Sequence, residues 1–200
     1  NKPRPTISDD MVEIRIDDVV LSVPANYTEL PRDRRSGERE QLFLYAAWPR
    51  MEGYTRARHT DFTENRPDSR RIDITIGVKR NPFSELQRLE IQYTPHLVDA
   101  EGTPYEHDLT KYVFKSGTAE NPASGYSDKE LYTGIATTGE KAVLFCYPED
   151  PDRVLPPECF REFELTSGVY VKYRFKRPYL SEWRKIDEGV KRLVGGLQGG

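Results

Sequence analysis

The sequence predicts an α+β fold, mostly antiparallel β, in which a C-terminal helix packs on a sheet or sandwich-like β body. Two observations lead to this prediction. The first is a series of short apolar or alternating segments separated by turns and one loop, at residues 131–136, 142–146, 160–165 and 169–175. Consecutive strands joined in this way pair antiparallel, so the series predicts a meander. The second is an apolar stripe after Pro178, with the spacing typical of one helix face.

Three or four strands are predicted in the N-terminal half. Residues 12–16 alternate between apolar and polar side chains, and residues 19–23 resume an apolar run after a turn, which predicts two short strands or one bent strand. Residues 41–47 are apolar and aromatic, and residues 72–76 alternate strictly. Alternation with period two is the pattern of a half-buried strand, so the last segment is the clearest strand in this half.

The segments between these strands are predicted as loops or as mixed structure. Residues 32–40 are nearly all charged, and residues 51–71 have no clean period, so both are predicted to be loops. A short helix from Pro82 is predicted to run into a strand at residues 89–93. Another strand is predicted at residues 109–114, followed by a loop rich in Gly, Ser, Asn and Pro at residues 116–128.

The C-terminal helix is predicted to begin near Pro178 and to end at Gly195-Gly196. Its apolar side chains recur at spacings of three and four residues, namely Leu180, Trp183, Ile186, Val190, Leu193 and Leu197. Such a stripe is typical of a helix that packs on the body of its own domain. We therefore expect Trp183 to be buried against the strand at residues 169–175, together with Leu180, Ile186 and Val190.

A disulfide bond is predicted between Cys146 and Cys159, the two cysteines of the chain. They bracket a proline-rich acidic segment between two predicted strands. Neighbouring strands lie about 5 Å apart, so cysteines at the two ends of such a loop can face each other. The alternative is two free thiols. Disulfides persist outside the cytosol, so the predicted bond indicates an extracytoplasmic protein.

The length of 200 residues suits a single domain, predicted at residues 11–200. Residues 1–10 are polar and contain two prolines, which favours a linker that follows a removed signal peptide or membrane anchor; an arbitrary boundary is the alternative. No segment approaches the roughly 20 apolar residues that a membrane-spanning helix needs. The net charge of −3 provides no overall basic field, so nucleic acid is not expected as a partner.

The candidate binding site is a loop rich in aromatic residues and arginine, with Trp48, Tyr54, Arg56, Arg58 and His59 as its candidate binding residues. Rigid aromatic rings and arginine are enriched in interaction sites. We therefore expect Arg56, Arg58 and His59 to face solvent and Tyr54 to be partly exposed beside them. The alternative is that Trp48 and Tyr54 anchor the loop to the protein body.

No catalytic residue, metal ligand or cofactor site is predicted from motifs. The sequence contains no phosphate-binding glycine loop, no nucleophile elbow, no HExxH motif and no paired CxxC motif. A metal site would have to assemble in three dimensions, and the candidate ligands for it are His96, Asp99, His107 and Asp108.

Several segments resemble a group of uncharacterised proteobacterial proteins described as transmembrane-anchored. They are residues 20–24, residues 42–49 with Gly53-Tyr54, residues 146–159, and residues 173–175 with Leu180, Trp183, Ile186 and Asp187. In those proteins a single N-terminal helix precedes a periplasmic domain. The resemblance implies a periplasmic location, with an inner-membrane anchor that is absent from this chain. It implies no activity.

Together these observations favour a non-enzymatic periplasmic or envelope binding domain, with an immunity- or inhibitor-like protein as one form of it. The partner would be an envelope protein or a small ligand. One alternative is a periplasmic hydrolase, which a deep pocket with convergent titratable groups of shifted pKa would favour. Another is a small-ligand or glycan sensor, which an aromatic-lined groove would favour.

Overall fold

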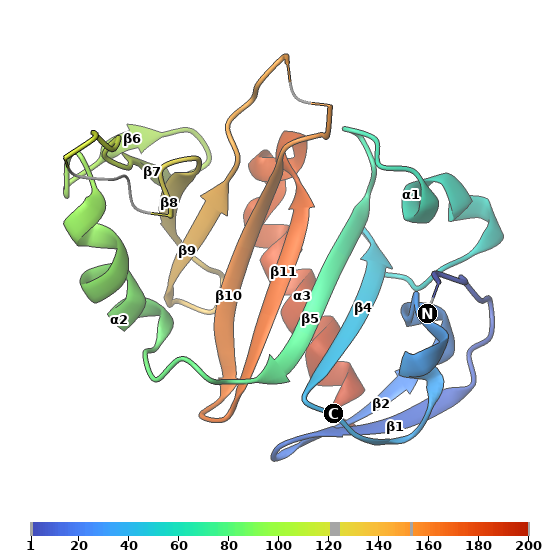
Figure 1. The fold of residues 1–200 in the computed structure, drawn as a ribbon. Helices are drawn as coiled ribbons and strands as arrows, with labels where there is room; N and C mark the ends of the chain where they lie inside the picture. The colour runs from blue at the N-terminus through green and yellow to red at the C-terminus, as the bar shows by residue number, and fades with distance from the viewer. Residues whose placement is uncertain (1, 121–124, 153, 200) are drawn as a thin grey trace.

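The computed structural model describes residues 2–120, 125–152 and 154–199, and it contains a large and a small β-sheet with a long C-terminal helix (Figure 1). The large sheet is antiparallel, in the order β4-β5-β11-β10-β9-β8-β7-β6. The small sheet has the order β2-β1-β3, with β1 and β3 parallel. The α+β class predicted from the sequence is confirmed.

The large sheet consists of β4 (Gln41–Ala47), β5 (Arg71–Val78), β6 (Thr103–Tyr105), β7 (Leu109–Val113), β8 (Glu130–Ile135), β9 (Lys141–Cys146), β10 (Glu158–Thr166) and β11 (Val169–Lys176). The small sheet consists of β1 (Met11–Ile16), β2 (Val19–Pro24) and β3 (Gly37–Glu38). The α-helices are α1 (His59–Thr63), α2 (Glu85–Arg88) and α3 (Trp183–Leu197). A π-helical turn, η4 (Leu89–Tyr93), continues α2, and 3-10 turns lie at η1 (Ala25–Tyr27), η2 (Pro31–Arg34), η3 (Arg56–Arg58), η5 (Thr94–His96) and η6 (Arg177–Glu182).

The main hydrophobic core lies between one face of the large sheet and the layer formed by α3, β1 and β2. Alternation along β5 places Ile72, Ile74 and Ile76 on this face, where each is at most 1% exposed. The helix contributes its apolar stripe to the same core. A face covered in this way explains why the alternating pattern of the sequence predicted these strands correctly.

Trp183, Leu180, Ile186 and Val190 are buried, as predicted, in the core that also contains the inward side chains of β11. The indole ring of Trp183 lies against Gly134 of β8, and its Nε1 donates a hydrogen bond to the carbonyl oxygen of His107 at 3.0 Å. A Cβ atom at position 134 would come within 2.7 Å of the ring, so this glycine allows the close approach of helix and sheet.

The predicted strand at residues 89–93 is wrong, because this segment is helical. Ser84 begins α2 with a capping box to Gln87, and the chain continues as a π-helical turn. Leu89 and Tyr93 are buried on one side of the turn, whereas Ile91 is 54% exposed. The apolar residues therefore follow a helical period here, although their spacing in the sequence also fits a strand.

Two predicted loops contain short elements that the sequence did not indicate. The loop at residues 51–71 includes η3 and α1, and the loop at residues 32–40 includes η2 and β3. Residues 2–10, predicted as a linker, contain no helix or strand, but the backbone N–H of Arg4 donates to the carbonyl of Glu29 at 2.9 Å. This segment therefore contacts the domain.

The junction between β9 and β10 is the narrowest in the large sheet. Only two residue pairs are in register, Cys146 with Cys159 and Phe145 with Phe160. The predicted disulfide bond joins the two cysteines at a Cα–Cα distance of 4.0 Å, and both are fully buried. It closes the base of a projecting loop that continues β9 (Figure 1), and it ties the two halves of the sheet together at one end of the junction.

We predict that the disulfide contributes about 3 kcal/mol to the free energy of unfolding, because it closes a loop of this length in the unfolded chain. The double variant C146A/C159A should unfold at a lower denaturant concentration than the oxidised wild type. Reductant should destabilise the wild type and leave the variant unchanged. Equal stability of the oxidised wild type and the variant would contradict the prediction.

Candidate functional site

The face of the large sheet opposite α3 is covered at its two ends and open in the middle (Figure 1). At the β4 end, α1 and the preceding loop form a small cluster of Tyr45, Ala47, Tyr54 and Phe62. At the other end, α2 and η4 form a second cluster over β8 and β9 with Leu89, Tyr93, Leu97, Phe114, Leu131, Val143 and Phe145. Between the two clusters, side chains of β5, β11 and β10 face solvent. We call this region the open face.

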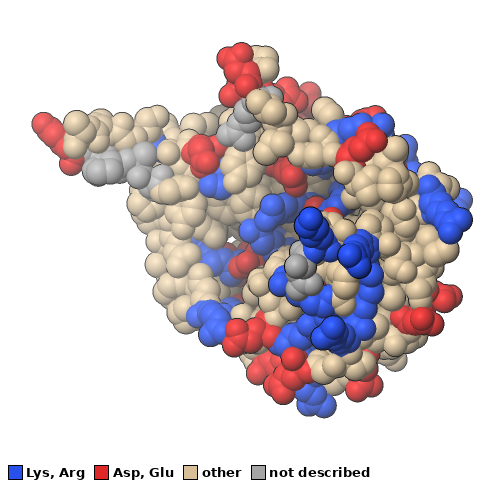
Figure 2. All heavy atoms as spheres, turned by 45° about the vertical axis from the view of Figure 1, so that its right-hand side comes forward, with Lys and Arg blue, Asp and Glu red and all other residues tan. Residues whose placement is uncertain are grey.

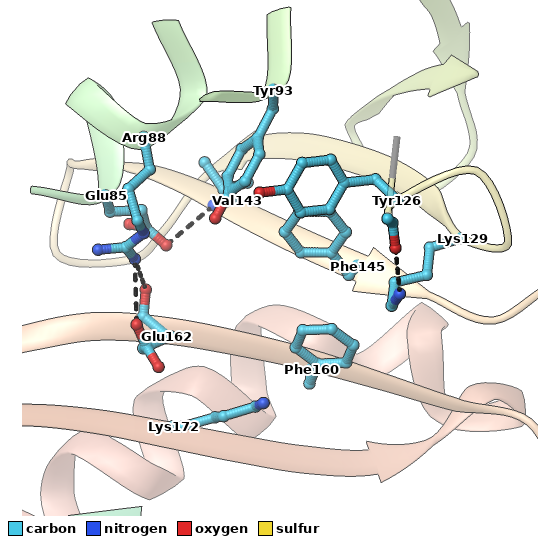
Figure 3. Close-up of a pocket in the computed structure, with 11 residues that line it drawn as sticks. Glu85, Arg88, Tyr93, Tyr126, Lys129, Val143, Phe145, Phe160, Glu162 and Lys172 are labelled. Carbon is cyan, nitrogen blue, oxygen red and sulfur yellow. Dashed lines mark hydrogen bonds and ion pairs between the residues drawn. The ribbon is translucent and has the colours of Figure 1, made fainter. Parts of the chain in front are cut away.

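A cavity of about 230 Å³ lies on the open face where the second cluster meets β10 and β11 (Figure 3). Its apolar walls are the rings of Tyr93, Tyr126, Phe145 and Phe160. Phe145 and Phe160 stack with their centroids 5.3 Å apart, and Tyr93 meets Phe145 edge to face at 4.9 Å. The aromatic rings therefore support one another, which favours a preformed cavity.

A second cavity of about 350 Å³ adjoins the first on the side of the disulfide loop. The two cavities share Lys129, Phe160 and Lys172. Tyr147 and Leu155 of the disulfide loop line the second cavity, so the loop forms one wall of it. Phe160 and Lys172, from neighbouring strands, are thus at the centre of a continuous depression.

Lys172 is a half-buried cation whose ammonium group lies over an aromatic ring. It lies directly opposite Glu162 in the pairing of β10 with β11, yet the carboxylate of Glu162 is turned toward Arg88 at 3.7 Å. The Nζ of Lys172 lies 4.6 Å from the centroid of the Phe160 ring instead. Burial, followed by the positive charge of Arg174, lowers the pKa of Lys172, and the charge of Glu162 opposes this shift only in part, so the charged form is under-stabilised.

Glu85 is held at the back of the cavity by contacts that support the fold. Its carboxylate accepts two hydrogen bonds from the guanidinium of Arg161, at 2.9 and 3.0 Å, and one from the backbone N–H of Val143 at 3.3 Å. Burial raises the pKa of Glu85, and the hydrogen bonds and charge of Arg161 oppose that rise. This carboxylate fills the space where β9 and β10 diverge.

Arg161 continues this network through the sheet to α3. It is 1% exposed, and its other terminal nitrogen donates to Asp187 at 2.7 Å. The same Asp187 oxygen accepts from the hydroxyl of Tyr173 at 2.6 Å, and the ammonium of Lys191 lies 2.8 Å from the second oxygen. The network therefore links α2 on the open side to α3 on the covered side.

The arrangement at the cavity is suited to binding. Burial also raises the pKa of Tyr93, but none of the three groups with shifted pKa at the cavity, Glu85, Tyr93 and Lys172, is hydrogen-bonded to another of them in the described structure. A nucleophile activated by an adjacent base would show such a hydrogen-bonded pair, and these three groups do not form one. A cavity of this size accepts one side chain or a small ligand.

The loop residues predicted as a binding site do not line the cavities described above. Tyr54 is 9% exposed and packs on Phe62 at 5.5 Å, so the expectation that it is partly exposed is wrong. Its hydroxyl forms a hydrogen bond with Nδ1 of His59 at 2.8 Å. Trp48 is half-buried against the main core. Both aromatic residues anchor the loop, which was the alternative interpretation.

The polar residues of that loop divide into two groups. Arg56 and His59 face solvent as expected. Arg58 is half-buried and pairs with Glu52 at 3.2 Å and Asp61 at 3.5 Å. A binding role for these residues stays a prediction. Across the described residues, no three His, Cys, Asp or Glu side chains are placed to hold a metal ion, and this includes the four candidate ligands identified in the sequence.

A basic cluster lies on the side of the molecule that carries the N-terminal segment, and Figure 2 shows lysine and arginine gathered there with acidic residues near the margin. Its arginines hold the local backbone. Arg34 donates to the carbonyl of Thr28 at 2.9 Å, and Arg39 donates to the carbonyls of Arg32 and Arg35 at 2.5 and 2.6 Å. These contacts give Arg34 and Arg39 a structural role in positioning η2.

The residues at the centre of the depression were not predicted as a site, although the sequence carried part of the signal. Alternation along β11 places Tyr170, Lys172 and Arg174 on the face opposite the core residues. The sequence does not show that α1 and α2 leave this part of the face uncovered. It therefore does not distinguish a binding face from an ordinary solvated one.

Two solved structures are similar to this chain over nearly its whole length. One is an immunity protein of the Stenotrophomonas maltophilia type IV secretion system, with a TM-score of 0.65 and 18% identity, covering 98% of both chains. The other is the iron-regulated outer membrane lipoprotein FrpD of Neisseria meningitidis, with a TM-score of 0.57 and 14% identity, covering 100% of this chain and 98% of the other. These likenesses show a shared fold.

No protein-family model and no curated protein matches the sequence. Among the described residues, none of the helices combines the length and apolar character required to cross a membrane.

We predict that Arg161→Ala lowers the free energy of unfolding by about 3–5 kcal/mol, because it leaves Glu85 buried without its cation and removes one cation from Asp187. Arg174→Ala is the matched control, since it removes an exposed arginine from the neighbouring strand and should change stability by less than about 0.5 kcal/mol. Urea denaturation at neutral pH measures both effects. Equal stability of the two variants would contradict a supporting role for the network.

Proposed function

We propose that this protein is a non-enzymatic, immunity-like interaction domain that binds a protein partner on the open face of its large sheet. The observation that carries the proposal is the uncovered middle of that face, which contains two adjoining cavities around Phe160 and Lys172. Aromatic rings beside charged groups are typical of the few residues that dominate binding energy at interfaces. The likeness in fold to an immunity protein over the full chain supports the same proposal.

The proposed location is the periplasm, with a tether to the inner membrane through an N-terminal helix that precedes this chain. The disulfide between Cys146 and Cys159 supports an extracytoplasmic location, since cytosolic thiols are kept reduced. The likeness in fold to a lipoprotein is compatible with it. The tether itself is suggested by the sequence resemblance described above.

A small-ligand sensor is the second candidate function. It is favoured by the aromatic lining of the smaller cavity, because small-molecule sites are concave and largely apolar with a few polar groups. The two candidates differ in what covers the open face. A protein partner would cover both cavities and the disulfide loop, whereas a small ligand would occupy the smaller cavity alone.

The test is to produce each protein encoded beside this gene in the periplasm of a host bacterium, with and without this protein. The proposal expects one such product to arrest growth alone and to be neutralised by this protein. The purified pair should bind, and Phe160→Ala should weaken binding about tenfold or more, because it removes a ring at the centre of the proposed interface.

The matched control is Val20→Ala, which shortens an exposed apolar side chain on the small sheet and should bind the partner as the wild type does. Equal weakening by both variants would place the interface elsewhere. If no neighbouring product is toxic or binds this protein, the immunity-like function is contradicted.

A further inference from the structure

We infer that the cavity beside Phe160 takes an aromatic side chain with an adjoining carboxylate, presented by a segment of the partner protein. This inference rests on the proposed function and specifies the chemistry of the partner. It follows from the way charge is distributed around the cavities and from the size and lining of the smaller one.

Every carboxylate that lines the two cavities is already matched with a cation of the protein. These pairs are Glu85 with Arg161 at 2.9 Å, Glu162 with Arg88 at 3.7 Å, and Glu158 with Lys176 at 3.3 Å. The acidic side chains of the site are therefore neutralised within the fold, and they do not attract a further cation from a partner.

Lys172, at the centre of the depression, and Arg174 beside it are not matched in this way. Within the described residues, neither Lys172 nor Arg174 has a carboxylate within 4.0 Å. Lys129, which both cavities share, lies 2.8 Å from Asp128. Glu162, opposite Lys172 on β10, opposes the lowering of its pKa but lies beyond ion-pair distance. A half-buried charge without a close ion pair is unfavourable, so a carboxylate that reaches Lys172 gains more than it would at a fully solvated lysine.

The aromatic walls of the smaller cavity favour an aromatic group next to the carboxylate of the ligand. Four aromatic rings line this cavity. At the edge of the cavity, the ammonium of Lys172 lies over the ring of Phe160. A cavity of about 150 Å³ holds a benzene ring, so the observed volume of about 230 Å³ accommodates one aromatic side chain. An aromatic group stacked in the cavity would place an adjoining carboxylate within reach of Lys172.

The probe is N-acetylphenylalanine, which carries an aromatic ring and a free carboxylate, and its matched control is N-acetylphenylalanine amide, which lacks the charge. Each is titrated into isotope-labelled full-length protein and followed by backbone amide shifts. The acid should give saturable shifts at Phe160, Lys172 and Tyr126. The amide should bind about tenfold more weakly, because it loses a charge-assisted hydrogen bond.

Two variants test the residue that carries the inference. Lys172→Gln should weaken binding of the acid about tenfold and leave binding of the amide unchanged, whereas Lys172→Arg should retain most of the affinity for the acid. Lys185→Gln is the control, because it removes an exposed lysine of α3 on the other side of the sheet. The dispersion of the amide spectrum confirms that each variant is folded.

Equal binding of acid and amide, or the absence of saturable shifts at the cavity, would overturn the inferred chemistry. Binding of the partner itself tests the proposed function separately from the inferred chemistry. A partner that binds Lys172→Gln as tightly as wild type supports the function and rejects the acidic segment. Displacement of the partner by N-acetylphenylalanine supports both the proposed function and the inferred segment. If the probe binds while the partner stays bound, the partner's segment does not occupy the cavity, and the inference is rejected.

Discussion

The large sheet depends on how its two halves are joined between β9 and β10. Two residue pairs are in register there, and the disulfide of Cys146 and Cys159 fixes that end of the junction. Beyond it the strands diverge, and the carboxylate of Glu85 fills the gap by binding Arg161 and the N–H of Val143. Removing one member of a buried ion pair is strongly destabilising, because it leaves the other charge buried without its partner. Arg161 therefore couples the placement of α2, α3 and both halves of the sheet.

The same junction creates the candidate binding site. β9 and β10 diverge beyond the paired residues Phe145 and Phe160, and the cavity lies beside this pair with α2 and η4 along its outer wall. Because Arg161 and Glu85 hold these elements from behind, we expect the cavity walls to be formed before any partner arrives. Such preorganisation lowers the entropic cost of binding. The disulfide also positions the loop that lines the adjoining cavity.

Most of the fold could be predicted from local patterns, whereas the site could not. Alternation identified β5 and β11, and the apolar stripe identified α3, because each pattern records which side of an element is buried. The pattern at residues 89–93 fits both a strand and a helix, and only the tertiary contacts of Leu89 and Tyr93 decide between them. The loop around Tyr54 has the composition of an interface but is an anchor. The open face depends on where α1 and α2 pack, which no local pattern of β11 reveals.

In the proposed complex the partner covers the open face around Lys172. Lysine acetylation of the protein, alone and in complex with the partner, tests it most directly, because mass spectrometry resolves the modification at each lysine. The partner should protect Lys172 and Lys129 from acetylation and leave Lys185 on α3 equally reactive in both states. Unchanged modification of Lys172 in a saturated complex would contradict it.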